Sequence, residues 1–140
     1  MKICIVTSSF PSGQNDPRAA AGVFVKDFAL AVAEHGHPVT VLTHKKIPDQ
    51  PTRIQGLDVE RFPWSGGGRP LSSLRLMSPS DVMAMSSWLR RGGKTLDRLH
   101  RRIGFDHVLA MWAVPAGLVA RRLKRRHRVP YTIWCLGSDI

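Results

Sequence analysis

The sequence predicts a doubly wound α/β domain, in which helices cover both faces of a parallel sheet. Five short apolar runs rich in β-branched residues alternate with segments whose apolar residues have helical spacing. Strands that are apolar along their whole length are typical of sheets buried on both faces. The 140 residues, 43% of them hydrophobic, suit one domain over residues 1–140 with a core of its own.

The predicted strands differ in how far they are buried. They comprise residues 2–7, 39–43, 57–62, 108–112 and 131–136. Residues 57–62 alternate apolar and polar side chains, which places this strand nearer the edge of the sheet. If the first three strands step outward and the fourth returns to the other side of the first, the strand order reverses beside the first strand. This arrangement predicts ligand binding between the loop of residues 8–21 and the segment 112–117.

Three helices are predicted between the strands. The first begins at Gly22, where apolar residues take up helical spacing. The second follows an irregular, mobile segment rich in Gly and Pro, residues 63–79, and is weakened by Gly92 and Gly93. The third begins at Pro115, because proline is favoured in the first turn of a helix.

The net charge of +11 is concentrated in the second half of the chain, on residues 90–102 and 121–128. This charge predicts acidic partners. Three interpretations stay open: a solvated helix face, contact with nucleic acid, and peripheral contact with an anionic membrane. Nucleic acid is the least favoured, because neither interleaved aromatic residues nor a known nucleic-acid motif accompanies the charges.

No run approaches the roughly 20 apolar residues that cross a bilayer, and no signal peptide is recognisable. A cytoplasmic location is therefore expected, and a peripheral position on the inner face of the membrane stays open. Cys4 and Cys135 fall in predicted buried strands, where free thiols are expected. Scattered histidines and the absence of an Asp-x-Asp pair predict that no metal is bound.

A dinucleotide cofactor is not expected. The first strand is followed by Ser8-Ser9-Phe10-Pro11, which lacks the glycine-rich turn that holds a pyrophosphate. The second strand is followed by His44 and two lysines, where an acidic residue would hold the ribose. A phosphate loop ending in Gly-Lys-Ser is absent as well.

Several segments together resemble a known family. They are residues 2–7, 22–33, 35–43, the run Trp112-Ala-Val-Pro-Ala-Gly and the run Gly137-Ser-Asp. In order and spacing they resemble the amino-terminal domain of family 4 glycosyltransferases, over essentially the whole chain. The resemblance implies a GT-B fold, in which two Rossmann-like domains face each other across a cleft. The first domain binds the acceptor, and the second, which holds most of the donor site, is absent from this chain.

The resemblance also implies an activity. Such an enzyme transfers a sugar, with retention of configuration, from a nucleotide diphosphate sugar to an acceptor hydroxyl, without a cofactor. A role in polysaccharide or glycolipid assembly and peripheral contact with anionic lipid follow from the same resemblance. The chain alone is expected to be inactive without a carboxyl-terminal domain or a partner chain. The alternative is a non-catalytic basic Rossmann-like module that binds nucleic acid or an anionic membrane.

Two groups of residues are expected at the donor phosphates. Gly22 leaves the N–H groups of Val23 and its neighbour at the positive end of the first helix, which suits an anion. Arg18 and Lys26 flank this point and carry charge that would neutralise a phosphate. The alternatives are that Gly22 only caps the helix and that both basic side chains are solvated.

Trp112 and the Gly137-Ser138-Asp139 run are expected at the acceptor. Trp112 is placed to stack on a sugar or lipid, or else fills the top of the core. Ser138 and Asp139 are able to hydrogen-bond ligand hydroxyls beside Gly137, or else form an ordinary turn or cap. Leu136 stands where many relatives have a histidine that faces the transferred sugar, so no catalytic residue is assigned.

Overall fold

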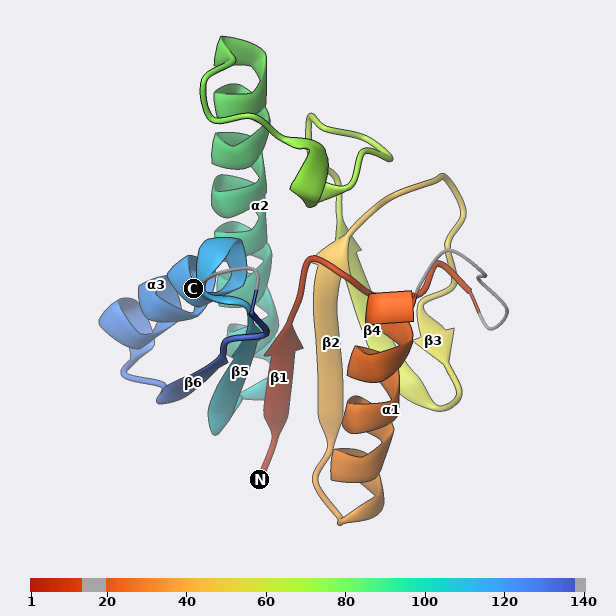
Figure 1. The fold of residues 1–140 in the computed structure, drawn as a ribbon. Helices are drawn as coiled ribbons and strands as arrows, with labels where there is room; N and C mark the ends of the chain where they lie inside the picture. Colours follow the sequence, from red (N-terminus) through yellow and green to blue (C-terminus); the bar gives the residue numbers. More distant parts are fainter. Residues whose placement is uncertain (14–19, 138–140) are drawn as a thin grey trace.

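The computed structural model describes residues 1–13 and 20–137. Within these residues one sheet contains six strands, in the order β3-β4-β2-β1-β5-β6 (Figure 1). The strands are β1 (Ile3–Val6), β2 (Val39–His44), β3 (Arg53–Ile54), β4 (Leu57–Phe62), β5 (His107–Met111) and β6 (Tyr131–Trp134). All neighbouring pairs are parallel except β3 with β4. The predicted doubly wound, Rossmann-like fold is confirmed.

Helices connect the strands and cover the sheet. They are α1 (Ala20–Glu34), the 3₁₀ turn η1 (Leu71–Ser73), α2 (Pro79–Ile103), the π turn η2 (Ala113–Gly117) and α3 (Leu118–His127). Pro115, the predicted start of the third helix, directly follows Val114, whose φ of −127° and ψ of 129° are not helical. It lies inside η2, which continues into α3 at Leu118. The first helix starts at Ala20, two residues before the predicted Gly22.

Alternation along β1 separates two apolar cores. Cys4 and Val6 face the core beneath α2 and α3, which includes Trp88 and Leu123. Ile5 faces the core beneath α1, which includes Val25, Val41 and Val59. Because neighbours along a strand point to opposite faces, one fully buried strand contributes to both cores.

The two cysteines lie in different surroundings. Cys4 is buried, and burial raises the pKa of its thiol. Cys135 follows the end of β6 and is exposed, so its predicted place in a buried strand is wrong. Both thiols are free in the structure.

Helix α2 runs unbroken through Gly92 and Gly93, although glycine weakens an isolated helix. A Cβ at position 92 would lie 3.0 Å from Cζ of Phe62, so this glycine lets the helix lie close to β4. The 25 residues of α2 carry its amino-terminal end well beyond the carboxyl edge of the sheet (Figure 1). Among the helices of residues 1–13 and 20–137, none is long and apolar enough to cross a membrane.

Candidate functional site

The strand order reverses between β1 and β5. Strand β1 pairs with β2 on one side and with β5 on the other, so that Ile3 lies beside both Val39 and His107. Parallel sheets of this kind bind ligands at the carboxyl ends of the strands that flank such a reversal. The predicted position of the switch point is confirmed, and the segments that leave β1 and β5 border it.

Two basic side chains hold the start of the loop that follows β1. Lys46 Nζ donates a hydrogen bond to the carbonyl oxygen of Phe10 at 2.9 Å. Arg61 Nη2 donates to the carbonyl oxygen of Pro11 at 2.8 Å. Phe10 is fully buried as well. The beginning of this loop is therefore fixed against the carboxyl ends of β2 and β4.

Arg61 is the most unusual charge at this edge. Arg61 is only 9% exposed, and its Nε and Nη1 atoms are buried without a hydrogen-bond partner among the described residues. Burial lowers the pKa of the guanidinium to about 10. Thr43 lies beside it in register on the same face, and the Thr43 hydroxyl is also buried without a partner. A buried cation that meets no carboxylate in the described part of the chain makes this edge suited to an anionic group.

The sequence analysis missed Arg61. It lies in a strand of alternating polar and apolar residues, a pattern that predicts an exposed side chain. The loop after β1 covers this position, and no local pattern shows that contact. The nearest signal was the pair of lysines that follow β2, which were noted only as standing where an acidic residue would hold a ribose.

Gly22 brings α1 against the same loop. A Cβ at this position would lie 3.0 Å from backbone atoms of Phe10 and Pro11, so glycine is needed for the close approach. A helix that starts at Ala20 leaves its unpaired N–H groups on residues up to Gly22. The N–H group of Val23 is the next one along the helix, and the expected contact of Gly22 and Val23 with a phosphate stays a prediction.

The two basic residues expected beside Gly22 differ in what the structure describes. Arg18 lies outside the described residues. Lys26 is 9% exposed, and its Nζ atom lies 3.9 Å from a carboxylate oxygen of Asp27. Lys26 is therefore not a fully solvated side chain, and it adds positive charge to the α1 face.

Trp112 directly follows β5 and has an uncommon backbone conformation. Its φ of 73° and ψ of 144° lie in a region occupied almost only by glycine. The conformation is fixed on both sides, since Trp112 N donates to the carbonyl of Trp134 at 3.0 Å and Gly117 N donates to the carbonyl of Trp112 at 3.2 Å. The side chain is half-buried against the α1 core. Strained residues held in this way cluster at functional sites.

Aromatic contacts bring the start of α1 to the end of β6. The Trp134 ring lies edge-on to Phe24 and Phe28, with centroid distances of 5.3 and 5.0 Å. Three residues further on, Gly137 has a φ of 94°, a conformation that glycine adopts readily. Ser138 and Asp139 lie outside the described residues, so their expected role stays a prediction.

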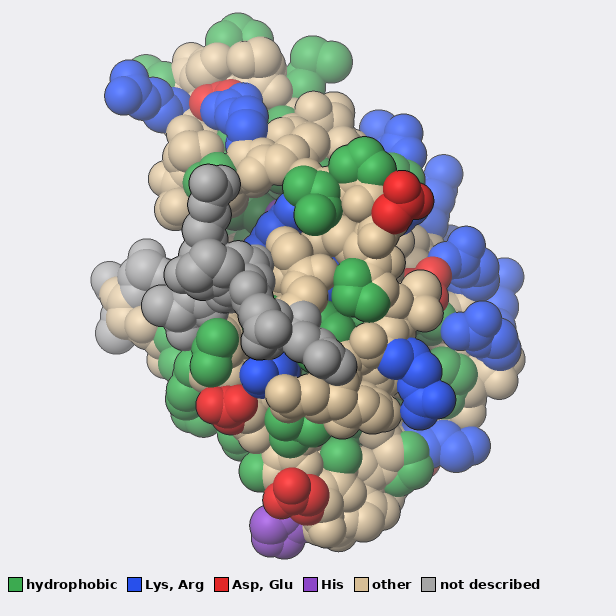
Figure 2. All heavy atoms as spheres, turned by 90° about the vertical axis from the view of Figure 1, so that its right-hand side faces the viewer, with side chains coloured by type: hydrophobic (Ala, Val, Ile, Leu, Met, Phe, Trp, Pro, Cys, Tyr) green, Lys and Arg blue, Asp and Glu red, His purple; other side chains and the backbone are tan. Residues whose placement is uncertain are grey.

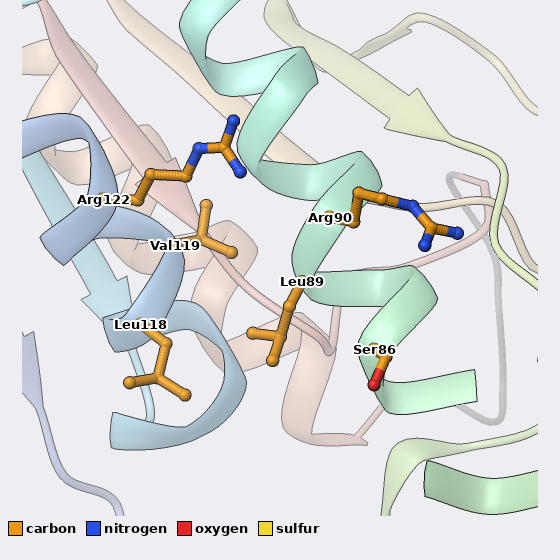
Figure 3. Close-up of a pocket in the computed structure, with 6 residues that line it drawn as sticks. All are labelled: Ser86, Leu89, Arg90, Leu118, Val119 and Arg122. Carbon is orange, nitrogen blue, oxygen red and sulfur yellow. The ribbon is translucent and has the colours of Figure 1, made fainter. Parts of the chain in front are cut away.

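A groove of about 370 Å³ lies between the amino-terminal parts of α2 and α3. It is lined by Ser86, Leu89, Arg90, Leu118, Val119 and Arg122 (Figure 3). Leu89, Leu118 and Val119 point into the space between the helices, and Arg122 reaches across toward α2. Leu118 is 42% exposed. An apolar floor with a cation at its rim is able to accept an amphipathic ligand.

A second hollow lies at the opposite edge of the sheet. Its lining includes Lys2, Gly36, Val39 and Asp58, which lie at or near the amino ends of the strands. Ligand sites of open parallel sheets lie at the carboxyl ends, so this hollow is not the candidate site. Within residues 1–13 and 20–137, no three His, Cys, Asp or Glu side chains are grouped to hold a metal.

Known structures share this architecture. A sucrose-phosphate synthase from Thermosynechococcus elongatus matches with a TM-score of 0.71 and 14% identity, over 99% of this chain and 65% of that one. Os79 from O. sativa, solved in complex with UDP, matches with a TM-score of 0.59 and 18% identity, over 94% of this chain and 28% of its own. The C-terminal domain of a Pyrococcus furiosus hydrogenase also matches, with a TM-score of 0.58 and 15% identity, over 94% of this chain and 89% of that domain.

At these identities the likeness concerns the fold alone, and the hydrogenase domain illustrates that one fold serves different functions. The chain spans less than two thirds of the sucrose-phosphate synthase and of Os79. Comparison with curated proteins finds no match. The family profile described as "Glycosyl transferase 4-like domain", however, matches residues 19–139. The chain therefore belongs to the family of glycosyl transferase 4-like domains and forms a Rossmann-like lobe of the GT-B type.

Proposed function

We propose that this chain is the acceptor-side lobe of a retaining glycosyltransferase. In the reaction, the bond between the anomeric carbon and the diphosphate of a nucleotide sugar breaks. The acceptor hydroxyl oxygen bonds to that carbon with retention and loses its proton, and the nucleoside diphosphate leaves. The observation that carries the proposal is the family match over residues 19–139 of a sheet whose strand order reverses at β1 and β5.

The residues expected at the cleft border this reversal. Of the described residues these are Gly22 of α1, Trp112 and Gly137, with Lys26 on α1. The proposal adds Arg18, Ser138 and Asp139, which lie outside the described residues. Arg61 adds a buried cation at the same edge. The UDP bound by the structural neighbour Os79 supports a nucleotide sugar as donor. A carboxyl-terminal domain or partner chain would complete the cleft, and no metal or cofactor is required in this proposal.

The groove between α2 and α3 is the proposed acceptor surface. Its apolar floor and Arg122 favour an amphipathic acceptor that carries an anionic group, as in polysaccharide or glycolipid assembly. This proposal includes peripheral contact with an anionic membrane. The nucleic-acid alternative predicts binding to oligonucleotides with a steep dependence on salt.

Titration calorimetry with two groups of ligands tests the proposal. One group contains UDP, GDP and dTDP sugars, and the other contains alkyl glycosides and lipid phosphate sugars in detergent. We expect binding in the acceptor group, weakened about tenfold by Leu118→Arg, which fills the groove, and not by Ile47→Arg, an exposed control that does not line it. Binding of donors alone, or equal binding by both variants, would contradict the proposed acceptor side.

A further inference from the structure

The outer face of α2 carries only positive charge. Every exposed residue of this helix from position 90 to position 102 is basic, whereas the residues between them are buried or half-buried. We define the basic face as Arg90, Arg91, Lys94, Arg98, Arg101 and Arg102. Figure 2 shows Lys and Arg side chains that follow one another down one side of the molecule. A one-sided distribution of charge creates a positive field that attracts anionic ligands.

Acidic side chains compensate little of this charge. Of the basic face, only Arg98 forms an ion pair among residues 1–13 and 20–137, with Glu60 at 2.8 Å. The side chains of this pair are 69% and 32% exposed, so solvent screens their attraction. Asp97, the only acidic residue in this stretch of α2, is buried and pairs with two arginines of α3. The other cations of the face are therefore available to an anionic partner.

The composition of the basic face distinguishes between anionic partners. A helix that binds a bilayer surface needs apolar side chains to enter it, and no large apolar side chain between Met83 and Val114 is exposed. Single-stranded nucleic acids stack their bases on aromatic side chains. Trp88, the only Trp, Tyr or Phe of α2, is fully buried. The face therefore suits a polymer that is bound through its charges alone.

The spacing of the cations favours an extended chain with regularly placed carboxylates. Arg91, Lys94, Arg98 and Arg101 follow one another at intervals of three or four residues, which is about 4.5–6 Å along the helix axis. This interval is comparable with the length of one sugar residue in a linear glycan. Arginine dominates the face, and its guanidinium binds a carboxylate through two parallel hydrogen bonds. The row of cations therefore fits a glycan built of uronic acids.

The basic face meets the groove between α2 and α3 at Arg90. This residue lines the groove, and its side chain points away from α3 (Figure 3). From Arg90 the cations continue to Arg102, over about 18 Å of the helix. A glycan chain that leaves the groove would therefore meet the basic face without a gap.

We propose that the basic face of α2 binds an acidic glycan built of uronic acids, which extends from the groove along the helix. This inference rests on the proposed function, because it identifies the acceptor as the end of an acidic polysaccharide. It also separates two segments that the sequence analysis treated alike, residues 90–102 and 121–128. On α3, Arg122 and Arg126 face Asp97 rather than solvent alone, so the row of uncompensated cations lies on α2.

Titration of the whole chain with acidic and neutral oligosaccharides tests the inference. Oligogalacturonate, which carries a carboxylate on every sugar, is compared with a neutral malto-oligosaccharide of the same length. We expect binding of the acidic oligosaccharide alone, weakened as the salt concentration rises. The double variant Lys94→Glu/Arg101→Glu should bind it at least about tenfold more weakly, because two attractive contacts become repulsive. The matched control Lys45→Glu/Arg75→Glu changes the net charge equally at exposed positions outside α2 and should bind nearly as well as the unmodified chain.

Three outcomes would overturn the inference. Absence of binding would mean that the basic face is only solvated, and equal losses in both double variants would mean that net charge alone attracts the ligand. Tighter binding of a single-stranded oligonucleotide with the same number of charges would assign the face to nucleic acid. Because all substituted residues are exposed, the melting temperature should stay unchanged, which separates lost binding from misfolding. If the groove titrations fail while oligogalacturonate still binds to the basic face, the proposed function is lost and the glycan site on α2 is retained.

Discussion

The two faces of the sheet compensate buried charge in different ways. Beneath α2 and α3, the buried carboxylate of Asp97 meets Arg126 at 2.6 Å, and Arg122 and His127 at 3.5 Å each. Beneath α1, the guanidinium of Arg61 donates a hydrogen bond to the carbonyl of Pro11, and it has no carboxylate partner among residues 1–13 and 20–137. A carboxylate surrounded by cations is typical of an interface that holds two helices together. A cation without a described carboxylate leaves room for an anion from elsewhere, which makes the α1 face the one suited to an anionic group of a ligand.

The largest effect that would sharpen this comparison is the pH dependence of stability through His44. Its ring is 1% exposed and accepts a hydrogen bond from Trp88 at Nδ1. Burial, with Lys46 and Arg61 nearby, lowers the pKa of His44 from 6.5 to about 3. Below pH 6.5 the unfolded chain binds a proton at His44, whereas the folded chain does not until the pH reaches about 3. The free energy of unfolding therefore falls as the pH decreases. We expect a loss of about 1.4 kcal/mol for each pH unit between pH 6 and 4.

Urea unfolding of the unmodified chain and of His44→Gln at several pH values measures this effect. The variant should lose the extra slope, whereas His35→Gln, an exposed control, should keep it. Identical slopes for all three proteins would contradict the expectation. If His44→Gln does not fold, the ring signals of His44 in the unmodified chain should show no titration above pH 4.

The next largest effect is expected at Asp97. Asp97→Asn leaves Arg122 and Arg126 without a negative partner, and we expect a loss of about 2 kcal/mol, because the arginines are partly exposed and the carboxylate is not. The control is Asp58→Asn, since the pair of Asp58 with Arg53 is 65% and 69% exposed and should contribute less than about 0.5 kcal/mol. If denaturant unfolding shows equal losses in the free energy of unfolding for both variants, the ion pairs of Asp97 do not stabilise the packing of α2 on α3.

Glycine replacements compare the packing of the two faces. Gly22→Ala should destabilise the protein by about 1 kcal/mol, because the new Cβ meets rigid backbone at 3.0 Å and this outweighs the better helix propensity of alanine. At Gly93 the nearest atom is Cδ of the Arg122 side chain, which is able to move. Gly93→Ala should therefore be neutral or stabilising by up to about 1 kcal/mol. The melting temperatures of both variants test this expectation. A Gly93→Ala variant that is less stable than Gly22→Ala would show that the loop after β1 is not fixed.

The smallest effect on stability is expected at Arg61, where ligand binding should change instead. Arg61→Met removes a buried charge together with one hydrogen bond, so stability should change by less than about 1 kcal/mol. Affinity for pyrophosphate should fall about tenfold, the value of one lost charge-assisted hydrogen bond. Arg61→Lys should retain part of the affinity, and Arg53→Met, at the exposed sheet edge, should retain all of it. Unchanged pyrophosphate binding in Arg61→Met would remove the distinction between the two faces.

Most of the fold was predictable because its strands are continuous apolar runs. Pairing of β1 with β2 and β5 follows the expected order. Strand β3 was missed, since its two residues form no pattern of their own and pair only because the turn at Gln55 and Gly56 folds them onto β4. Gly92 and Gly93 were interpreted from local propensity, whereas their contacts with Phe62 and Arg122 favour small residues in a continuous helix.

The switch point of the sheet was predictable in position, but the contacts around it were not. The switch point and the place of Trp112 after β5 follow from strand order. The positive φ of Trp112 does not follow from strand order, because backbone hydrogen bonds with Trp134 and Gly117 impose it. The segment of residues 63–79 was predicted to be mobile, yet Gly68 packs so closely on the carbonyl of Lys46 that a Cβ would lie at 2.8 Å. Such contacts between distant segments leave no trace in local sequence patterns.

The two-residue strand β3 also protects the sheet against uncontrolled association. An edge strand with free N–H and C=O groups is a template for the chain of another molecule, and this is how fibres begin to grow. Here the edge is a short antiparallel stub whose Arg53 side chain is 69% exposed and paired with Asp58. An incoming strand would find few groups to bond and a charge in its way, so this side of the sheet resists aggregation.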